Sequence, residues 1–190
     1  MSRIRRVLGI NGSASLNSTN LNILKTIAEL GISEFELKIF DSLIELPHFQ
    51  TELTDENVPV KVTEFRNQVL NADGIIISTP EYIFSIPSGL KNAIEWCVST
   101  TVFTDKPVGI VTASASGEKG HEELKLILKT VQSKFNTDTT LLIGGAKGKY
   151  NKNGTIIDSS TENKLKSFTK AFLKLLDESE ITSDGSIPLL

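Results

Sequence analysis

The stretch "ADGIIISTP", residues 72–80, places three consecutive isoleucines between a glycine and a proline. Successive side chains of a strand point to opposite faces, so an apolar run without polar alternation is buried on both faces. Proline cannot donate to a sheet ladder, so Pro80 ends the strand. The runs at residues 4–10 and 107–113 ("PVGIVTA") have the same character. We therefore expect a parallel sheet that helices cover on both sides.

Helical and strand-like segments alternate along the rest of the chain. Strand candidates occupy residues 4–10, 35–40, 72–80, 107–113 and 139–144. Apolar residues at spacings of three and four predict helices within residues 21–30, 58–69, 87–99, 124–131 and 165–176. This alternation predicts an α/β fold, a three-layer, doubly wound five-stranded parallel sheet with right-handed crossovers. Such a sheet has a truncated Rossmann order or the flavodoxin-like order 2-1-3-4-5, and we expect the latter.

Length, charge and cysteine content restrict the class of protein. The 190 residues suit one domain, placed at residues 1–178, with a C-terminal tail at 179–190 that shows no periodicity. A net charge of −3 does not favour nucleic acid or an anionic membrane as a partner. The apolar stretch near the start is about four residues long, and a secretory signal needs about 7 to 15, so none is expected. Cys97, the single cysteine, cannot form an internal disulfide, which fits a cytoplasmic protein.

Three loops of unusual composition, residues 11–20, 79–88 and 113–120, are predicted at the carboxyl ends of the strands, where such sheets bind ligands. The first belongs to "GINGSASLNSTN", residues 9–20, in which nine of twelve residues are Gly, Ser, Thr or Asn and none is charged. Free N–H groups at a helix start, with hydroxyl donors nearby, bind phosphate without a cation. The glycine spacing matches neither the dinucleotide nor the triphosphate-binding motif. The alternative is a capped helix start, where Ser and Thr are expected anyway.

The second loop lies in "STPEYIFSIPSGLKNAIEW", residues 78–96. Pro80 stops the strand, and Pro87 suits the first turn of the next helix. Between them, the large apolar side chains of residues 82–84 are expected on an exposed loop, which is costly unless a flat apolar ligand covers them. The alternative is a loop that packs on its own domain or on a partner subunit.

At these residues the chain resembles the NAD(P)H-dependent FMN reductase family, which includes flavodoxin-like quinone, azo-dye and chromate reductases. The resemblance rests on "TPEY", "IP" and "LKNAIEW" within residues 79–96, on "LP" at 46–47 and on "NKNGTIID" at 151–158. It extends to the family's first loop, G-S-x-R-x-x-S-x-N, in residues 12–20. Two positions depart from the pattern: Ser15 stands where the family has arginine, and Ile83 stands where asparagine is common.

The resemblance implies a bound FMN that receives hydride from NAD(P)H as co-substrate and passes electrons to a small-molecule acceptor. The implied contacts to the phosphate come from Ser13, Ser15, Ser18, Thr19 and Asn20. Those to the ring come from Pro80, Glu81, Tyr82, Ile83, Phe84, Ser114, Ser116 and Gly117. Because the flavin carries the chemistry, we expect no catalytic side chain and no metal. The glycines of the third loop permit the close backbone approach that a planar ligand needs.

Three other side chains could be mistaken for catalytic groups, and a fourth is a candidate for a subunit interface. We expect Glu81 to be structural, His121 to be exposed at a helix start and Cys97 to be a buried, inert thiol. Trp96 is expected to be half exposed and, as in the resembling family, to lie at a homodimer or homotetramer interface; the alternative is a tryptophan that packs on its own domain. Two other functions stay open: a flavodoxin-type electron carrier without its own NAD(P)H oxidation, and a phosphate-binding domain without flavin.

Overall fold

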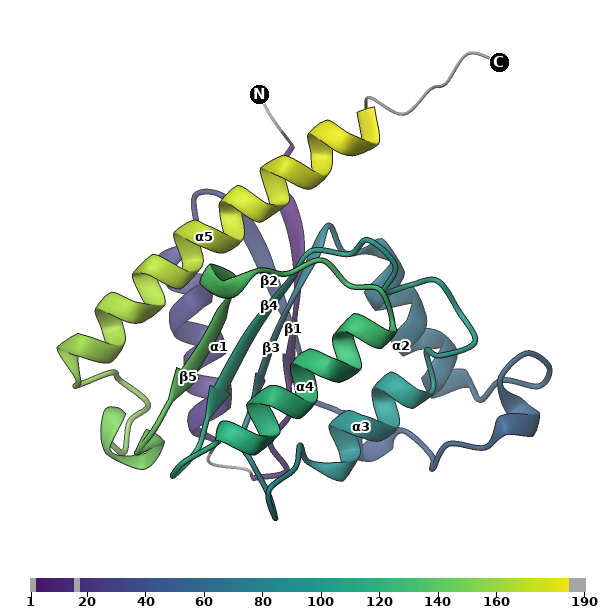
Figure 1. Ribbon diagram of the computed structural model, residues 1–190, viewed down its shortest axis with the longest axis horizontal. Coiled ribbons are helices and arrows are strands. Elements are labelled where there is room, and N and C mark those ends of the chain that lie inside the picture. The colour runs from purple at the N-terminus through teal and green to yellow at the C-terminus, as the bar shows by residue number, and fades with distance from the viewer. Residues whose placement is uncertain (1–2, 16–17, 185–190) are drawn as a thin grey trace.

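The computed structural model describes residues 3–15 and 18–184, so Leu16 and Asn17 of the first loop lie outside the described residues. Its sheet has five parallel strands in the order β2-β1-β3-β4-β5, which confirms the predicted fold and order. The strands are β1 Arg5–Asn11, β2 Phe35–Phe40, β3 Gly74–Thr79, β4 Val108–Ala113 and β5 Thr140–Ile143. All carboxyl ends therefore lie at one edge of the sheet, at the bottom of Figure 1.

Helices cover both faces of the sheet. The α-helices are α1 Thr19–Leu30, α2 Val60–Asn71, α3 Ser88–Glu95, α4 Glu118–Thr130 and α5 Ser159–Asp184, and the short 3-10 helices are η1 Leu43–Glu45, η2 Thr51–Leu53, η3 Thr137–Thr139 and η4 Ala146–Lys149. One core cluster joins the sheet to α2, α3 and α4, and a second joins it to α1 and α5. In Figure 1, α3 and α4 lie in front of the strands and α1 lies behind them.

The central strand β3 is buried on both faces, which accounts for its unbroken run of isoleucines. All six of its residues are buried, with Ile75 and Ile77 in one core cluster and Ile76 in the other. Its neighbour β4 carries Gly109 because the aromatic residues of α5 pack directly on the strand. A Cβ at Gly109 would lie 2.7 Å from the ring of Phe168, so a larger residue would push α5 away from the sheet.

The last helix is longer than its apolar periodicity predicted. Residues 179–184, assigned to the tail, continue α5, while residues 185–190 lie outside the described residues. Arg5, at the start of β1, forms ion pairs with Asp177 and Glu180 of this helix. These pairs bring the polar end of α5 to the amino edge of the sheet, opposite the predicted ligand site. The division into a domain and a tail stays a prediction. No helix in the described ranges is long and apolar enough to cross a membrane.

The expectation that Trp96 is half exposed is wrong. Its side chain is fully buried, its Nε1 donates to the carbonyl of Pro47 at 2.7 Å, and its ring meets that of Phe49 edge-on at 5.3 Å. Asn92 donates to the same carbonyl at 3.0 Å and accepts from the N–H of Phe49 at 2.8 Å. The "LKNAIEW" and "LP" segments therefore hold each other in place, and Trp96 is not available to a second subunit.

Candidate functional site

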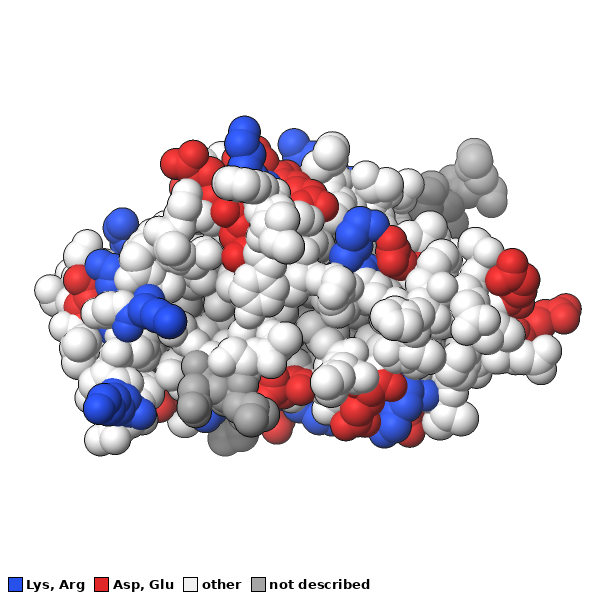
Figure 2. All heavy atoms as spheres, turned by 90° about the horizontal axis from the view of Figure 1, so that it is seen from below, with Lys and Arg blue, Asp and Glu red and all other residues white. Residues whose placement is uncertain are grey.

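Three loops meet at the carboxyl edge of the sheet, as the sequence predicted, and hydrogen bonds tie each of them to its neighbours. The N–H of Gly12 donates to the carbonyl of Ser78 at 2.8 Å. The side chain of Asn20 donates to the carbonyl of Ala113 at 3.2 Å, and the hydroxyl of Ser114 donates to the carbonyl of Glu81 at 3.4 Å. Figure 2 shows this edge face-on as a broad, mostly uncharged surface with charged side chains around it.

Asn11, which the sequence analysis did not single out, organises the first loop. It is buried at the end of β1, and its Nδ2 donates to Asp41 at 2.6 Å. Its Oδ1 accepts from the N–H of Ser13 at 3.2 Å and from the hydroxyl of Ser18 at 3.4 Å. A side chain that bonds its own backbone two residues on is typical of turns. An asparagine directly after an apolar strand was the signal that could have found it.

The serines and asparagine of the first loop divide into two groups. Ser18 caps α1 by accepting from the N–H of Leu21 at 3.2 Å, so the capped-helix interpretation is also correct for this residue. Asn20 is buried, with its Oδ1 accepting from the hydroxyl of Ser78 at 3.0 Å. The side chains of Ser18 and Asn20 are thus engaged within the protein, and the Ser18 carbonyl accepts from the N–H of Asn22 at 3.2 Å, so these two residues would offer main-chain N–H groups to a ligand.

Ser13, Ser15 and Thr19 are the hydroxyl groups that stay accessible. Ser13 and Thr19 are half-buried and Ser15 is exposed. The Ser13 hydroxyl accepts from the N–H of Ser15 at 3.2 Å, which leaves its proton free for donation to another group. Between them, Gly12 must stay small, because a Cβ there would lie 2.7 Å from the Cβ of Thr79. The loop therefore offers uncharged donors on a backbone that is packed closely against β3.

The second loop forms a tight turn with an apolar tip. The N–H of Tyr82 donates to the carbonyl of Ser85 at 2.9 Å, and the N–H of Ser85 returns a bond at 3.0 Å. Ile83 and Phe84 have φ values of 51° and 58°, the left-handed pair of a type I′ turn, which normally selects Asn, Asp or Gly. Their side chains are 94 % and 77 % exposed. A β-branched residue in left-handed backbone is strained, and such strain tends to gather at functional sites.

Helix α4 holds both ends of this turn. The carboxylate of Glu81 accepts from the N–H of Gly120 at 2.8 Å, and that of Glu123 accepts from the N–H of Ile86 at 3.2 Å. Gly120 allows the close approach, since a Cβ there would lie 3.2 Å from the carbonyl of Ser85. The predicted structural role of Glu81 is therefore confirmed. Because the two carboxylates anchor the turn, its tip is placed by the framework and not by the ligand.

His121 is not the exposed helix-start residue that we expected. It is 7 % exposed, and its Nδ1 lies 2.8 Å from the hydroxyl of Thr112. Burial, with a smaller contribution from the nearby Lys125 cation, lowers the pKa of His121, so the ring is neutral at pH 7. The sequence alone could not show this contact of His121, because Thr112 faces α4 only once β4 has paired in register with its neighbouring strands. His121 thus serves as a packing residue.

Cys97 is a buried thiol, as expected. Burial raises its pKa to about 12, against a small opposing effect of Arg66, so the thiolate is not formed at neutral pH. A buried, protonated thiol of this kind is a poor nucleophile at neutral pH.

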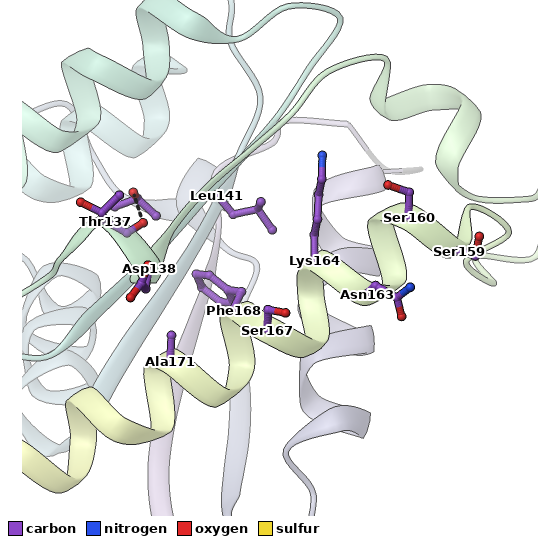
Figure 3. Close-up of a pocket in the computed structure, with 11 residues that line it drawn as sticks. Thr137, Asp138, Leu141, Ser159, Ser160, Asn163, Lys164, Ser167, Phe168 and Ala171 are labelled. Carbon is purple, nitrogen blue, oxygen red and sulfur yellow. Dashed lines mark hydrogen bonds between the residues drawn. The ribbon is translucent and has the colours of Figure 1, made fainter.

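A cavity of about 800 Å³ lies away from the three loops, between β5 and one face of α5. Figure 3 shows the Leu141 side chain pointing from the edge strand toward Lys164 of the helix, and the Phe168 ring also lines the cavity. The lining is otherwise mostly hydroxyl and amide groups, and it holds none of the predicted cofactor residues. This groove is a consequence of the edge position of β5 and does not replace the site at the carboxyl edge.

The open parallel sheet, its hydroxyl-rich first loop and its apolar second turn define the class: a flavodoxin-like flavoenzyme. A model of the NADPH-dependent FMN reductase family matches residues 5–147, and the chain belongs to this family. It is therefore an NAD(P)H-dependent oxidoreductase with FMN as its cofactor and NAD(P)H as its co-substrate.

Two relatives and one solved structure show the extent of the similarity. The chain is 33 % identical over 187 residues to the NADH:(hydroxy)cinnamate reductase subunit CrdA of Vibrio ruber, covering 92 % of each chain. It is 28 % identical over 188 residues to a quinone reductase of Escherichia coli, covering 95 % of this chain and 100 % of that protein. The structure of FerB, an NAD(P)H:(acceptor) oxidoreductase from Paracoccus denitrificans, has the same fold, with a TM-score of 0.76, 22 % identity and coverage of 93 % and 99 %.

The residues present at the carboxyl edge fit FMN chemically. A phosphate ester needs several hydrogen-bond donors, and the accessible hydroxyls of Ser13, Ser15 and Thr19 supply them at the start of α1. A tricyclic ring needs a flat apolar surface and close main-chain approach, and the exposed side chains of Ile83 and Phe84 supply the first. The individual contacts stay predictions.

Proposed function

We propose that this protein transfers a hydride from a nicotinamide nucleotide to FMN held at the carboxyl edge of the sheet, and passes the electrons to a small apolar acceptor of the quinone type. The observation that carries the proposal is the meeting of an uncharged donor loop and an anchored apolar turn at one sheet edge. When bound, FMN supplies the hydride and electron chemistry, so the side chains need only bind and orient.

In this proposal the first loop binds and the second loop orients. Ser13, Ser15 and Thr19 donate to the phosphate, together with main-chain N–H groups at the start of α1. Main-chain groups of residues 80–84 bond the polar edge of the ring, and residues 114–117 flank its other side. The two carboxylate hydrogen bonds fix the turn against α4, so its main-chain groups are held in place for a planar ligand.

The tip of the second loop supports an apolar acceptor over a metal oxyanion. Ile83 and Phe84 present unpaired apolar surface beside the proposed ring position. A quinone or an azo dye would cover this surface, whereas an oxyanion would leave it in water. One relative's name specifies quinone reduction and another specifies hydroxycinnamate, and both substrates are planar and conjugated.

Homodimer or homotetramer formation and a cytoplasmic location remain part of the proposal. Since Trp96 is buried, we propose that the exposed side chains of the turn, Tyr82, Ile83 and Phe84, meet a second subunit near the site. They would close the flavin site from outside. Light scattering of a Phe84→Ser variant, beside the wild-type protein, tests whether the turn joins subunits.

The competing function is an electron carrier of the flavodoxin type, which the uncharged phosphate loop favours. One preparation separates the two. Purified protein should show the visible absorbance of bound flavin, and NADH or NADPH should bleach it without oxygen and reduce an added quinone. Flavin binding without bleaching by either nucleotide supports the carrier. A colourless protein that does not bind added FMN contradicts both.

A further inference from the structure

A second hollow opens beside the first loop, on the side of α1. It has a volume of about 610 Å³ and lies between the start of that helix and the segment that follows η4. The lining residues are Ser18, Thr19, Leu21, Asn22, Lys25, Lys147, Tyr150, Asn151, Lys152, Asn153 and Gly154. Three are lysines, none is acidic, and most of the others end in a hydroxyl or an amide. We call this hollow the lysine groove.

The three lysines of the groove lack the partners that many other lysines of this chain have. In the part of the chain that the structure describes, seven lysines form ion pairs with carboxylates, among them Lys149, whose Nζ lies 3.3 Å from Asp158. Within the described ranges, no carboxylate pairs with Lys25, Lys147 or Lys152. Three like charges around one hollow repel each other, so the groove is electrostatically prepared for an anion. In Figure 2, blue side chains gather at the left, over the end of the molecule that holds β5 and the segment after it.

Contacts with α1 fix the far wall of the groove. The hydroxyl of Tyr150 lies 3.1 Å from that of Thr26, and Tyr150 is buried. The side chain of Asn151 accepts two main-chain N–H bonds, at 3.0 and 2.9 Å, which close a tight turn. Gly154 has a φ of 78°, and a Cβ there would lie 2.9 Å from the side-chain oxygen of Asn22. The wall is therefore docked on the helix and is not a loose loop.

The same segment is bonded to the third loop of the candidate site. The N–H groups of Gly145 and Ala146 donate to the carbonyls of Ala115 and Ser114 at 3.1 and 3.0 Å. Lys147 follows directly, so its backbone is held next to the predicted flavin site. On the opposite wall, Ser18 and Thr19 belong both to the groove and to the loop predicted to bind phosphate. The groove is thus continuous with a loop that has no charge of its own.

We propose that Lys25, Lys147 and Lys152 form a cationic site for a phosphate ester next to the first loop. This inference rests on the proposed function, which places a phosphorylated cofactor at that loop. The phosphate belongs either to FMN or to the nicotinamide nucleotide, and both present the same chemistry to ammonium groups. The lysines supply from one side the positive charge that the loop lacks.

The test compares ligands with and without the phosphate. FMN and riboflavin are titrated into the wild-type protein and a Lys147→Gln/Lys152→Gln variant, with Lys170→Gln, an exposed lysine of α5 outside the groove, as the matched control. The double variant should bind FMN about tenfold more weakly, with a smaller salt dependence, because each exposed charge contributes up to about threefold. Riboflavin binding and the control should not change.

A second arm distinguishes the source of the phosphate. If FMN affinity is unchanged but the KM for NADPH and NADH rises in the double variant, the groove takes a phosphate of the nucleotide; a rise for NADPH alone identifies its 2′-phosphate. Unchanged FMN affinity together with unchanged KM for both nucleotides overturns the proposal. If the wild-type protein binds neither flavin, the proposed function fails, and calorimetry with pyrophosphate then tests the lysine groove alone. Pyrophosphate binding that the double variant loses supports the site. The absence of pyrophosphate binding to the wild-type protein refutes it.

Discussion

Replacing Ile83 by asparagine should stabilise this protein, although it removes an apolar side chain. The φ of Ile83 is 51°, and left-handed backbone costs an L-residue about 1–2 kcal/mol, with asparagine among the few that adopt it readily. Because Ile83 is 94 % exposed, the burial lost on substitution amounts to only about 0.2 kcal/mol. The difference leaves a net gain in the free energy of unfolding of about 1 kcal/mol.

Thermal unfolding followed by circular dichroism measures this gain. For a chain of 190 residues, about 1 kcal/mol corresponds to a rise in Tm of about 2–4 °C. Flavin-free and FMN-saturated samples are compared separately, because a bound ligand raises Tm by itself. The matched control is Ile44→Asn: Ile44 is also 94 % exposed but lies in the 3-10 helix η1, where asparagine relieves no strain.

A Tm for Ile83→Asn at or below that of the wild-type protein would refute the strain argument. An equal rise in Ile44→Asn would show that the gain comes from removing exposed apolar surface. The same variant should lower kcat/KM for a quinone, because the tip is proposed to present apolar surface to the acceptor beside the flavin ring.

Three further predictions concern buried positions. Gly12→Ala should cost about 2–3 kcal/mol of stability, because its Cβ would meet Thr79, and urea unfolding should show a lower midpoint at constant slope. Stability should fall as pH drops below about 6.5, because His121 takes up a proton in the unfolded chain at a higher pH than in the folded protein, where its pKa is lowered. The loss of stability is complete once the pH lies below the pKa of folded His121. The His121→Gln variant should show a weaker pH dependence of stability in unfolding experiments at pH 5 to 7. Cys97, with a pKa of about 12, should react with maleimide at pH 8 only in denaturant, and rapid labelling of the native protein would contradict its burial.

The fold could be predicted because its signals are local. The isoleucines of β3 must be buried on both faces, and the helices between strands carry apolar residues at regular spacing. These patterns fixed the number of strands and, with the rules for crossovers, left few topologies. The length of α5 escaped prediction because its last turns pair with Arg5, a contact across almost the whole chain.

The side-chain roles in the site were harder to predict, because they depend on partners that only the folded chain brings together. The burial of His121 requires Thr112 on the facing strand, and that of Trp96 requires the carbonyl of Pro47. Composition identified the first loop as rich in donors, but it could not separate Ser15, which faces solvent, from Asn20, whose amide joins two strands. Such distinctions follow from register and packing and leave no trace in a single sequence.

The contacts between the "LP" and "LKNAIEW" segments show which positions near the site tolerate substitution and which do not. The side chains of Asn92 and Trp96 support the backbone of residues 47–49, whereas the side chains of Ile83 and Phe84 project from an anchored turn and are largely exposed. If these two side chains contact the acceptor, as proposed, acceptor preference can change at two positions at little cost to folding. A library of variants restricted to positions 83 and 84 would search for new substrates while nearly every member retained the native fold.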